Sequence, residues 1–272
     1  MARWLGVVSA SLCLVCCSKA GLAQAPAAAP PLVTAAAAKT TFPANAAELD
    51  TLLLQRNYAK LSQIFRDTKK HEDVVLNMNW QQVRLFTGGT AFLAFPYIAD
   101  LDRVASSLWD ARGADMKKTA IIMFLYAYEL TLIDGQRCKD LSAPAHRKDQ
   151  LLTGYPNLRK TIAALSDEEM DEVLKTAVKM EGISASWRRD DDYLCRGGMK
   201  EINAALTKYG DSATREIPTP PGGVGKSMAL KMDPDFKPEF LDKEVWLPKQ
   251  AELRPQLPEL LANLVSGVRK KK

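Results

Sequence analysis

The sequence predicts an all-α fold, an irregular bundle of several helices over residues 46–210 followed by a proline-rich, mostly irregular C-terminal tail over residues 211–272. Three observations support this prediction. Apolar residues recur at helical spacing throughout the body, no segment alternates apolar and polar residues over the length of a strand, and eight prolines punctuate the tail. Helical spacing gathers apolar side chains on one helix face, whereas alternation is typical of a half-buried strand.

The first helices are expected from capping signals and helical spacing. Asn45 and Glu48 form an Asn-x-x-Glu pattern, which is typical of a helix start. A second helix is expected at 72–87. The segment 90–112 has a helical pattern that contains Pro96. Because proline lacks an N–H donor and clashes with the preceding turn, we expect the helix to bend or restart there.

Residues 119–133 form the most apolar run of the body. The run has 15 residues, fewer than the roughly 20 that a transmembrane helix needs. We therefore expect a central helix surrounded by others, and no transmembrane span in the mature chain. The run contains Glu129, and a buried carboxylate without a partner is costly to desolvate. Glu129 is expected either to point out of the core or to meet a partner such as an arginine.

The second half of the body is expected to hold short helices at 144–152 and 156–165 and a last core helix at 191–208. Between them, Ser166 and Glu169 form a Ser-x-x-Glu capping box that predicts a helix start. These signals are local, so they predict where helices begin without showing how the helices pack.

In the tail, no long element is expected before a short helix at 256–268, because each proline restricts the residue that precedes it. Isolated aromatic residues such as Phe236 and Trp246 are expected to anchor an extended strap on the helical body. We expect the tail to add little else to the core.

The N-terminus predicts export. Residues 1–23 combine a positive charge at Arg3, a short apolar core at 4–17 and small residues up to Ala23, which is typical of a cleaved secretory signal peptide. The Ala/Pro-rich residues 24–45 are expected to form a disordered linker. The predicted location is the bacterial periplasm. An alternative is a lipid-anchored envelope protein acylated at Cys17.

The charge distribution argues against a nucleic-acid partner. The chain has 37 Lys and Arg against 32 Asp and Glu. Loss of Arg3 and Lys19 with the signal peptide leaves 35 basic against 32 acidic residues, a net charge of +3. Residues 269–272 alone carry four positive charges, so the rest of the mature chain is close to neutral. A nucleic acid requires a clustered basic face rather than a basic end.

The mature chain keeps two cysteines, Cys138 and Cys195, because the other three lie in the signal peptide. In an oxidising compartment an even number of cysteines predicts a disulfide. A zinc site that adds His146 and Asp192 is the weaker alternative, since the spacing matches no tight pair of zinc ligands. We therefore expect the disulfide, with no metal and no cofactor.

Two sequence patterns resemble functional sites. Gly225-Lys226-Ser227 resembles the end of a phosphate-binding loop, but position 220 is proline where that loop requires glycine, so we expect a turn and no bound nucleotide. The run Asp190-Asp191-Asp192 precedes a predicted helix, where carboxylates cap the helix start and interact favourably with the helix dipole.

Function is the least determined property of the sequence. The recognised motifs of serine hydrolases, zinc proteases and haem attachment are absent from it. The leading hypothesis is an exported α-helical binding or structural protein of the cell envelope. The alternative is a periplasmic hydrolase that uses Glu129 or Asp190–Asp192 with His146. These carboxylates and the histidine are the sequence's candidates for a polar site.

Overall fold

The computed structural model describes residues 41–108, 110–190, 192–217, 226–233 and 235–270. In this part of the chain the fold is all-α apart from one two-stranded β-ribbon, as the sequence predicts. The predicted signal peptide, the lipidation alternative and the linker as far as residue 40 lie outside the described residues.

The described chain begins with two short helices, α1 (Ala46–Leu54) and α2 (Tyr58–Asp67). They meet at Arg56, whose φ of +56° is in the left-handed region that glycine usually occupies. The Asn57 side chain caps α2 by accepting a backbone N–H of the first turn. Asn45 makes no side-chain cap hydrogen bond, so the predicted capping there was wrong. Its backbone lacks the extended conformation that an N-cap residue adopts.

Helix α3 (His71–Phe86) confirms the predicted helix at 72–87 and is followed by a left-handed glycine, Gly88. The next helix, α4 (Ala94–Ser107), contains Pro96 in its first turn. One of the two expected outcomes, a helix that starts anew near this proline, is confirmed, because α4 begins at Ala94 directly after a 3₁₀ turn. Pro96 fits there because a first-turn residue has no intrahelical N–H bond to lose. A second break in segment 90–112 comes before Ala111, where α5 begins.

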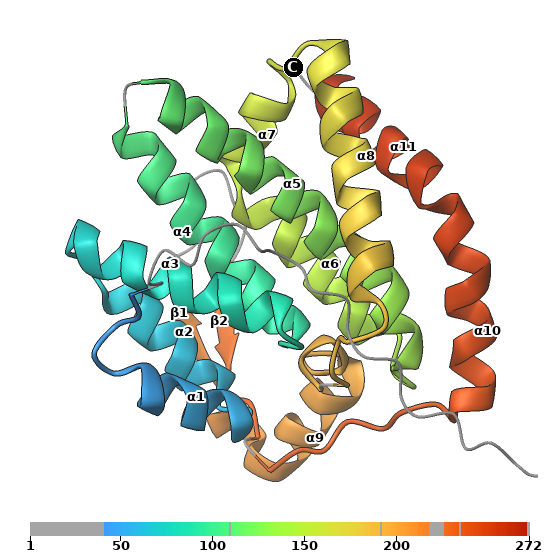
Figure 1. Ribbon diagram of the computed structural model, residues 1–272. Helices are drawn as coiled ribbons and strands as arrows, with labels where there is room; N and C mark the ends of the chain where they lie inside the picture. Colours follow the sequence, from blue (N-terminus) through green and yellow to red (C-terminus); the bar gives the residue numbers. More distant parts are fainter. Residues whose placement is uncertain (1–40, 109, 191, 218–225, 234, 271–272) are drawn as a thin grey trace, which may run out of the picture. The chain divides into compact units, whose positions relative to one another are not determined.

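Helix α5 (Ala111–Ile133) contains the apolar run and lies at the centre of the bundle, with α4 and α8 on either side (Figure 1). Helices α6 (Ser142–Gly154) and α7 (Pro156–Ile162) also pack against it. The expected central helix is thereby confirmed. No helix in the described part of the chain is both long and apolar enough to cross a membrane.

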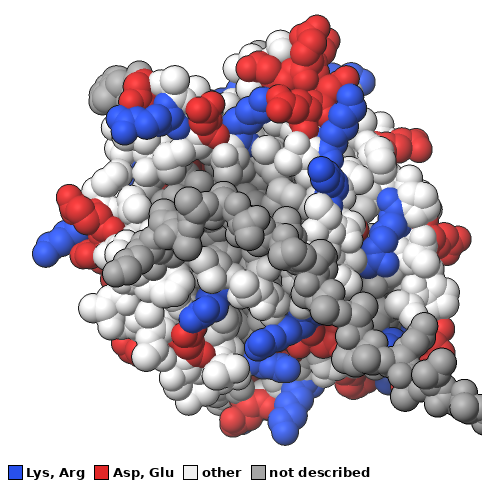
Figure 2. All heavy atoms as spheres, viewed as in Figure 1, with Lys and Arg blue, Asp and Glu red and all other residues white. Residues whose placement is uncertain are grey.

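Helix α8 (Asp167–Ser184) begins at the predicted capping box. The Glu169 N–H donates to Ser166 Oγ at 3.2 Å, and the Ser166 N–H donates to the Glu169 carboxylate at 3.0 Å. Carboxylates gather at this helix start (Figure 2), where the positive end of the helix dipole stabilises them.

Helix α9 spans Met199–Tyr209, so the predicted start of this helix at 191 was wrong. A 3₁₀ turn and two glycines precede it, and Gly197 has a φ of +83°, which an α-helix cannot accommodate. Short 3₁₀ helices also join other elements of the fold: η1 (Ala91–Leu93), η2 (Asp134–Arg137), η3 (Tyr193–Cys195), η4 (Gly210–Ala213) and η5 (Arg254–Gln256).

The tail contains more regular structure than the sequence predicts. Strands β1 (Thr214–Ile217) and β2 (Ser227–Leu230) pair antiparallel, with Thr214 opposite Leu230. The expectation that no long element precedes residue 256 was wrong, because α10 (Lys243–Leu253) forms with Pro248 inside it. Helix α11 (Leu257–Lys270) agrees with the predicted terminal helix.

Helix α11 packs on α7 and α8 and lies alongside α8 (Figure 1). Its residues Leu257, Leu261 and Val265 are buried at the spacing of one helix face. The tail therefore contributes aliphatic residues to the core, and the expectation that it adds little beyond aromatic anchors was wrong. Proline density does not exclude packing once an amphipathic helix forms between the prolines.

Candidate functional site

The predicted disulfide joins Cys138 to Cys195, whose Cα atoms are 5.1 Å apart and whose sequence separation is 57 positions. Both sulfurs are therefore bonded to each other and not to a metal. In the described part of the chain, no three His, Cys, Asp or Glu side chains gather in a way that could hold a metal ion.

A strap from the tail crosses the chain beside this disulfide. Phe240 forms an isolated antiparallel bridge with Cys138. On either side of the bridge, the Lys139 N–H donates to the Glu239 carbonyl at 3.0 Å and the Leu241 N–H donates to the Arg137 carbonyl at 2.8 Å. An extended strap was expected from the sequence.

Glu129 is fully buried in α5, and neither of its carboxylate oxygens has a hydrogen-bond partner among the described residues. Burial and the nearby charge of Glu181 raise its pKa to about 8, although Arg188 lowers it. The side chain is therefore a neutral acid at pH 7. It neither points out of the core nor forms an ion pair, which were the two expected outcomes.

Arg188 is the centre of a buried ion network beside Glu129. Its guanidinium donates to Asp134 at 2.9 Å, to Glu181 at 2.7 Å and to the hydroxyl of Ser184 at 2.6 Å. Arg254 from the tail also reaches Glu181, at 3.3 Å. The network ties α8 to the end of α5 and to the tail, so its position indicates a structural role.

The aspartate run occupies separate environments. Asp190 is exposed and pairs with Arg137, whereas Asp192 accepts from the Tyr58 hydroxyl at 3.3 Å and pairs with Arg56 at 3.8 Å. Asp192 makes no cap hydrogen bond to η3, so the predicted capping by this residue was wrong. Asp191 lies outside the described residues.

His146 hydrogen-bonds through Nδ1 to the Gly197 carbonyl at 2.9 Å. A carbonyl only accepts, so Nδ1 carries the proton and donates it. Because both Glu129 oxygens lack a hydrogen-bond partner, His146 and Glu129 are not hydrogen-bonded to each other. His146, Glu129 and Asp190 thus have different partners, and no hydrogen bond joins them into one site.

The phosphate-loop pattern lies partly outside the described residues, since positions 222–225 are not described. Lys226 pairs with Glu216 across the β-ribbon at 2.8 Å. Strand β2 begins directly after Lys226. A phosphate-binding loop is followed by a helix and not by a strand, so the pattern lacks the required context here.

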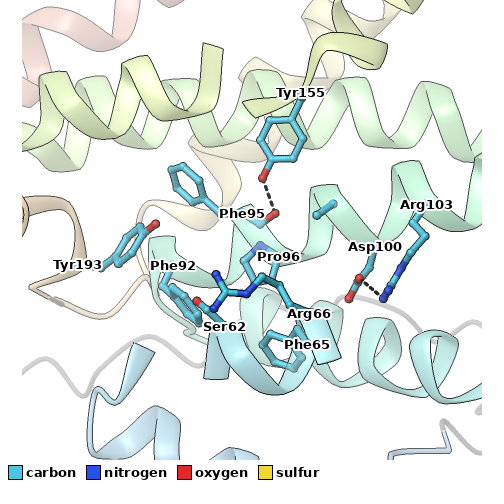
Figure 3. A pocket seen from close by; sticks show the side chains of 11 residues that line it. Ser62, Phe65, Arg66, Phe92, Phe95, Pro96, Asp100, Arg103, Tyr155 and Tyr193 are labelled. Carbon is cyan, nitrogen blue, oxygen red and sulfur yellow. Dashed lines mark hydrogen bonds and ion pairs between the residues drawn. The ribbon is translucent and has the colours of Figure 1, made fainter. Parts of the chain in front are cut away.

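The structure has a cavity of about 370 Å³ between α2, η1, α4, η3 and Tyr155, the residue that joins α6 to α7. We call it the aromatic cavity, because its wall is mostly aromatic and apolar (Figure 3): Phe65, Phe92, Phe95, Pro96, Tyr155 and Tyr193. The rings are packed together, since the Tyr193 centroid lies 5.2 Å from Phe92 and 5.3 Å from Phe95. The Tyr155 hydroxyl donates to the Phe95 carbonyl at 2.7 Å. These contacts favour a preformed apolar wall.

A second cavity of about 630 Å³ adjoins the first, and both are lined by Ser62, Phe92 and Tyr193. We call it the arginine cavity, because Arg56 and two further arginines line it, and we call the two cavities together the groove. Gly197 also lines this cavity, so the loop that the disulfide holds forms part of the wall.

The groove is positively charged. The lining residues described for it include five arginines and two carboxylates: Arg56, Arg66, Arg103, Arg147, Arg196, Asp100 and Glu201. The two carboxylates already accept hydrogen bonds from lining arginines. A surplus of guanidinium groups beside apolar rings is suited to a ligand that is both anionic and partly apolar.

None of these groove residues belongs to a motif in the sequence that predicts a binding site. Their strongest local signal is a stripe on α4, where Phe95, Ala99 and Arg103 recur every four residues and line the same cavity. Tyr193 and Ser62 come from distant segments of the chain, and only the fold brings them to this stripe. The chain matches no protein-family model, no curated protein and no solved structure with which it was compared.

Proposed function

We propose that this chain is an exported binding protein of the cell envelope, and that its groove binds an extended ligand with an apolar body and negative charge. One observation carries the proposal. Two adjoining cavities share an aromatic wall, and five arginines against two carboxylates line them. A concave, mostly apolar site with a few convergent polar groups is the usual form of a ligand-binding site.

The groove supports binding better than catalysis. Its described lining contains no histidine or cysteine, and its two carboxylates are engaged with arginines. Nucleophilic catalysis requires a nucleophile beside a base that activates it. Glu129, the group with the most perturbed acidity among the sequence candidates, is buried in α5 and does not line the groove.

A fluorescent apolar anion tests the proposal directly. We expect 8-anilinonaphthalene-1-sulfonate to bind the folded protein in a saturable manner, with fluorescence that increases as the probe leaves water. Arg66→Ala and Tyr193→Ala should each weaken binding about tenfold, which corresponds to about 1.4 kcal/mol. Arg112→Ala is the matched control, because Arg112 is an exposed arginine outside the groove. Equal affinity in all four proteins would contradict a groove site.

Export is supported by the composition of residues 1–23 and requires its own test. We expect N-terminal sequencing of the protein from an envelope fraction to begin near Gln24. An intact mass that includes acyl chains on Cys17 would favour the lipid-anchored alternative. Retention of Met1 would contradict export by signal cleavage.

A further inference from the structure

We propose that the groove binds the C-terminal end of a polypeptide, with a bulky apolar last side chain in the aromatic cavity and its terminal carboxylate on Arg66. This inference rests on the proposed function, because it names the ligand class of the same groove. Three features carry it: an available guanidinium, the apolar cavity beside it, and the length of the groove.

Arg66 is the available guanidinium of the aromatic cavity. Arg103, the other arginine there, donates to Asp100 at 2.7 Å and to the Thr68 carbonyl at 2.9 Å. The Arg66 side chain makes no hydrogen bond or ion pair with the described residues, and it lines the cavity together with Phe92 and Pro96 (Figure 3). A guanidinium presents two parallel N–H groups, which match the two oxygens of a carboxylate.

The wall beside Arg66 is suited to a bulky side chain. The cavity of about 370 Å³ is surrounded by the rings of Phe65, Phe95 and Tyr155, and the Tyr155 hydroxyl is already bonded to a backbone carbonyl. An aromatic or branched aliphatic side chain would therefore meet apolar surface there. Burial of such a side chain removes apolar surface from water and therefore favours binding.

The arginine cavity makes the groove long enough for a ligand of several residues. It continues from the aromatic cavity past Ser62 and is lined by Gln55 and Asn57. Asn57 Oδ1 caps α2, which leaves the N–H groups of this amide and the Gln55 amide to hydrogen-bond to a peptide backbone. The Arg147 Cζ lies 4.3 Å from the centroid of the Tyr193 ring, and the guanidinium also donates to Gln150 Oε1 at 2.8 Å. Because Arg147 lines this cavity, its positive charge would attract an acidic side chain further up the ligand. A short free acid would leave this second cavity empty, so the geometry favours a peptide.

Calorimetry with the full-length protein tests the inference with four label-free probes. The first is an acetylated hexapeptide with glutamate at its third position and phenylalanine last, with a free C-terminus. The second is the same peptide with an amidated C-terminus, the third has glycine as its last residue, and the fourth is N-acetyl-phenylalanine. We expect the first peptide to bind at least tenfold more tightly than each of the others.

The variant Arg66→Ala separates the carboxylate contact from general charge. We expect it to bind the free and the amidated hexapeptides equally, whereas the control Arg112→Ala keeps the full difference. Amidation without effect on the wild-type protein, or an undiminished effect in Arg66→Ala, would overturn the inference. Equal affinity for N-acetyl-phenylalanine and the hexapeptide would overturn the assignment to a peptide.

The dye experiment distinguishes failure of this inference from failure of the proposed function. If the fluorescent anion binds the groove but the hexapeptides do not compete with it, the groove binds another class of ligand and only the inference fails. If neither the dye nor the peptides depend on Arg66 and Tyr193, both fail.

Discussion

Arg188 donates two hydrogen bonds to the carboxylate of Asp134, at 2.9 and 3.1 Å, and both side chains are inside the helical body. The same guanidinium reaches Glu181, so one cation neutralises two buried carboxylates from different parts of the fold. Removal of this cation would leave Asp134 and Glu181 with only the longer contacts to Arg137 at 3.7 Å and to Arg254 at 3.3 Å. Part of their buried charge would then be uncompensated, which is costly.

The first prediction follows from this network. Arg188→Met should lower the free energy of unfolding by up to about 3–5 kcal/mol, because two buried carboxylates lose their closest cation and keep only a weaker one each. Urea denaturation followed by circular dichroism measures the change. Arg112→Met is the control and should cost less than about 1 kcal/mol, since Arg112 makes an exposed ion pair with Asp110. Equal losses in the two variants would contradict the structural role of Arg188.

The second prediction concerns pH and Glu129. In the unfolded chain this carboxyl loses its proton near pH 4.5, whereas in the folded protein its pKa is raised to about 8. Between these values the folded state holds a proton that the unfolded state has released, so rising pH favours unfolding by up to about 1.4 kcal/mol per pH unit. The stabilising contribution of the protonated form is complete below pH 4.5 and is lost as the pH rises to 8.

Glu129→Gln removes this titration and keeps a neutral side chain of similar shape. We expect the variant to gain stability relative to the wild-type protein from pH 5 to pH 8, and the difference to stay constant above pH 8. Urea midpoints measured at pH 5, 7 and 9 test this expectation. Parallel pH profiles for the two proteins would show that the acidity of Glu129 is not perturbed by folding.

The third prediction concerns the disulfide. The Cys138→Ser/Cys195→Ser protein should lose roughly 4 kcal/mol of stability, because a crosslink between residues 57 positions apart restricts the unfolded chain. Scanning calorimetry of the variant and of the wild-type protein with and without reductant measures the loss. A reductant that destabilises the wild-type protein but not the double variant would assign the effect to this bond.

The fourth prediction tests whether the tail is part of the core. Leu261→Ala on α11 should cost about 2–5 kcal/mol, because it opens a cavity at a fully buried position. Leu247→Ala on α10 is a matched control, since Leu247 is 45% exposed and its truncation should cost within about 0.5 kcal/mol. If both variants melt like the wild-type protein, the tail adds little to the core.

The fifth prediction separates stability from binding at the edge of the groove. Arg56 has a left-handed backbone, which costs a non-glycine residue roughly 1–2 kcal/mol. Arg56→Gly should therefore keep or raise the unfolding free energy, while the loss of one positive charge weakens binding of the anionic dye. A variant that binds the dye normally would exclude Arg56 from the ligand contacts.

The helices of the body are largely predictable from sequence because their signals are local. The capping box at Ser166 and the apolar run around Glu129 both correspond to helices, and the helix at 72–87 forms as expected. An error arose where a single residue prevents a helix: Gly197 has a left-handed backbone at a position where the sequence pattern predicted a continuous helix.

The groove could not be predicted in the same way. Ser62, Phe92 and Tyr193 carry no motif and come from separate segments, so their proximity depends on how α2, η1 and η3 pack. The disulfide was predictable because only two of the five cysteines lie outside the predicted signal peptide. The protonation state of Glu129 was not predictable, because it depends on burial and on distant charges rather than on the spacing of residues in the sequence.

The position of Cys195 between Tyr193 and Gly197 has a consequence for how the protein matures. The same short loop carries a bridged sulfur and three residues of the groove, Tyr193, Arg196 and Gly197. A newly made chain with free thiols lacks the crosslink that holds this loop against η2, so we expect its groove to be incomplete. The proposed ligand would then bind tightly only after the disulfide has formed. A newly made chain would not bind it before that step.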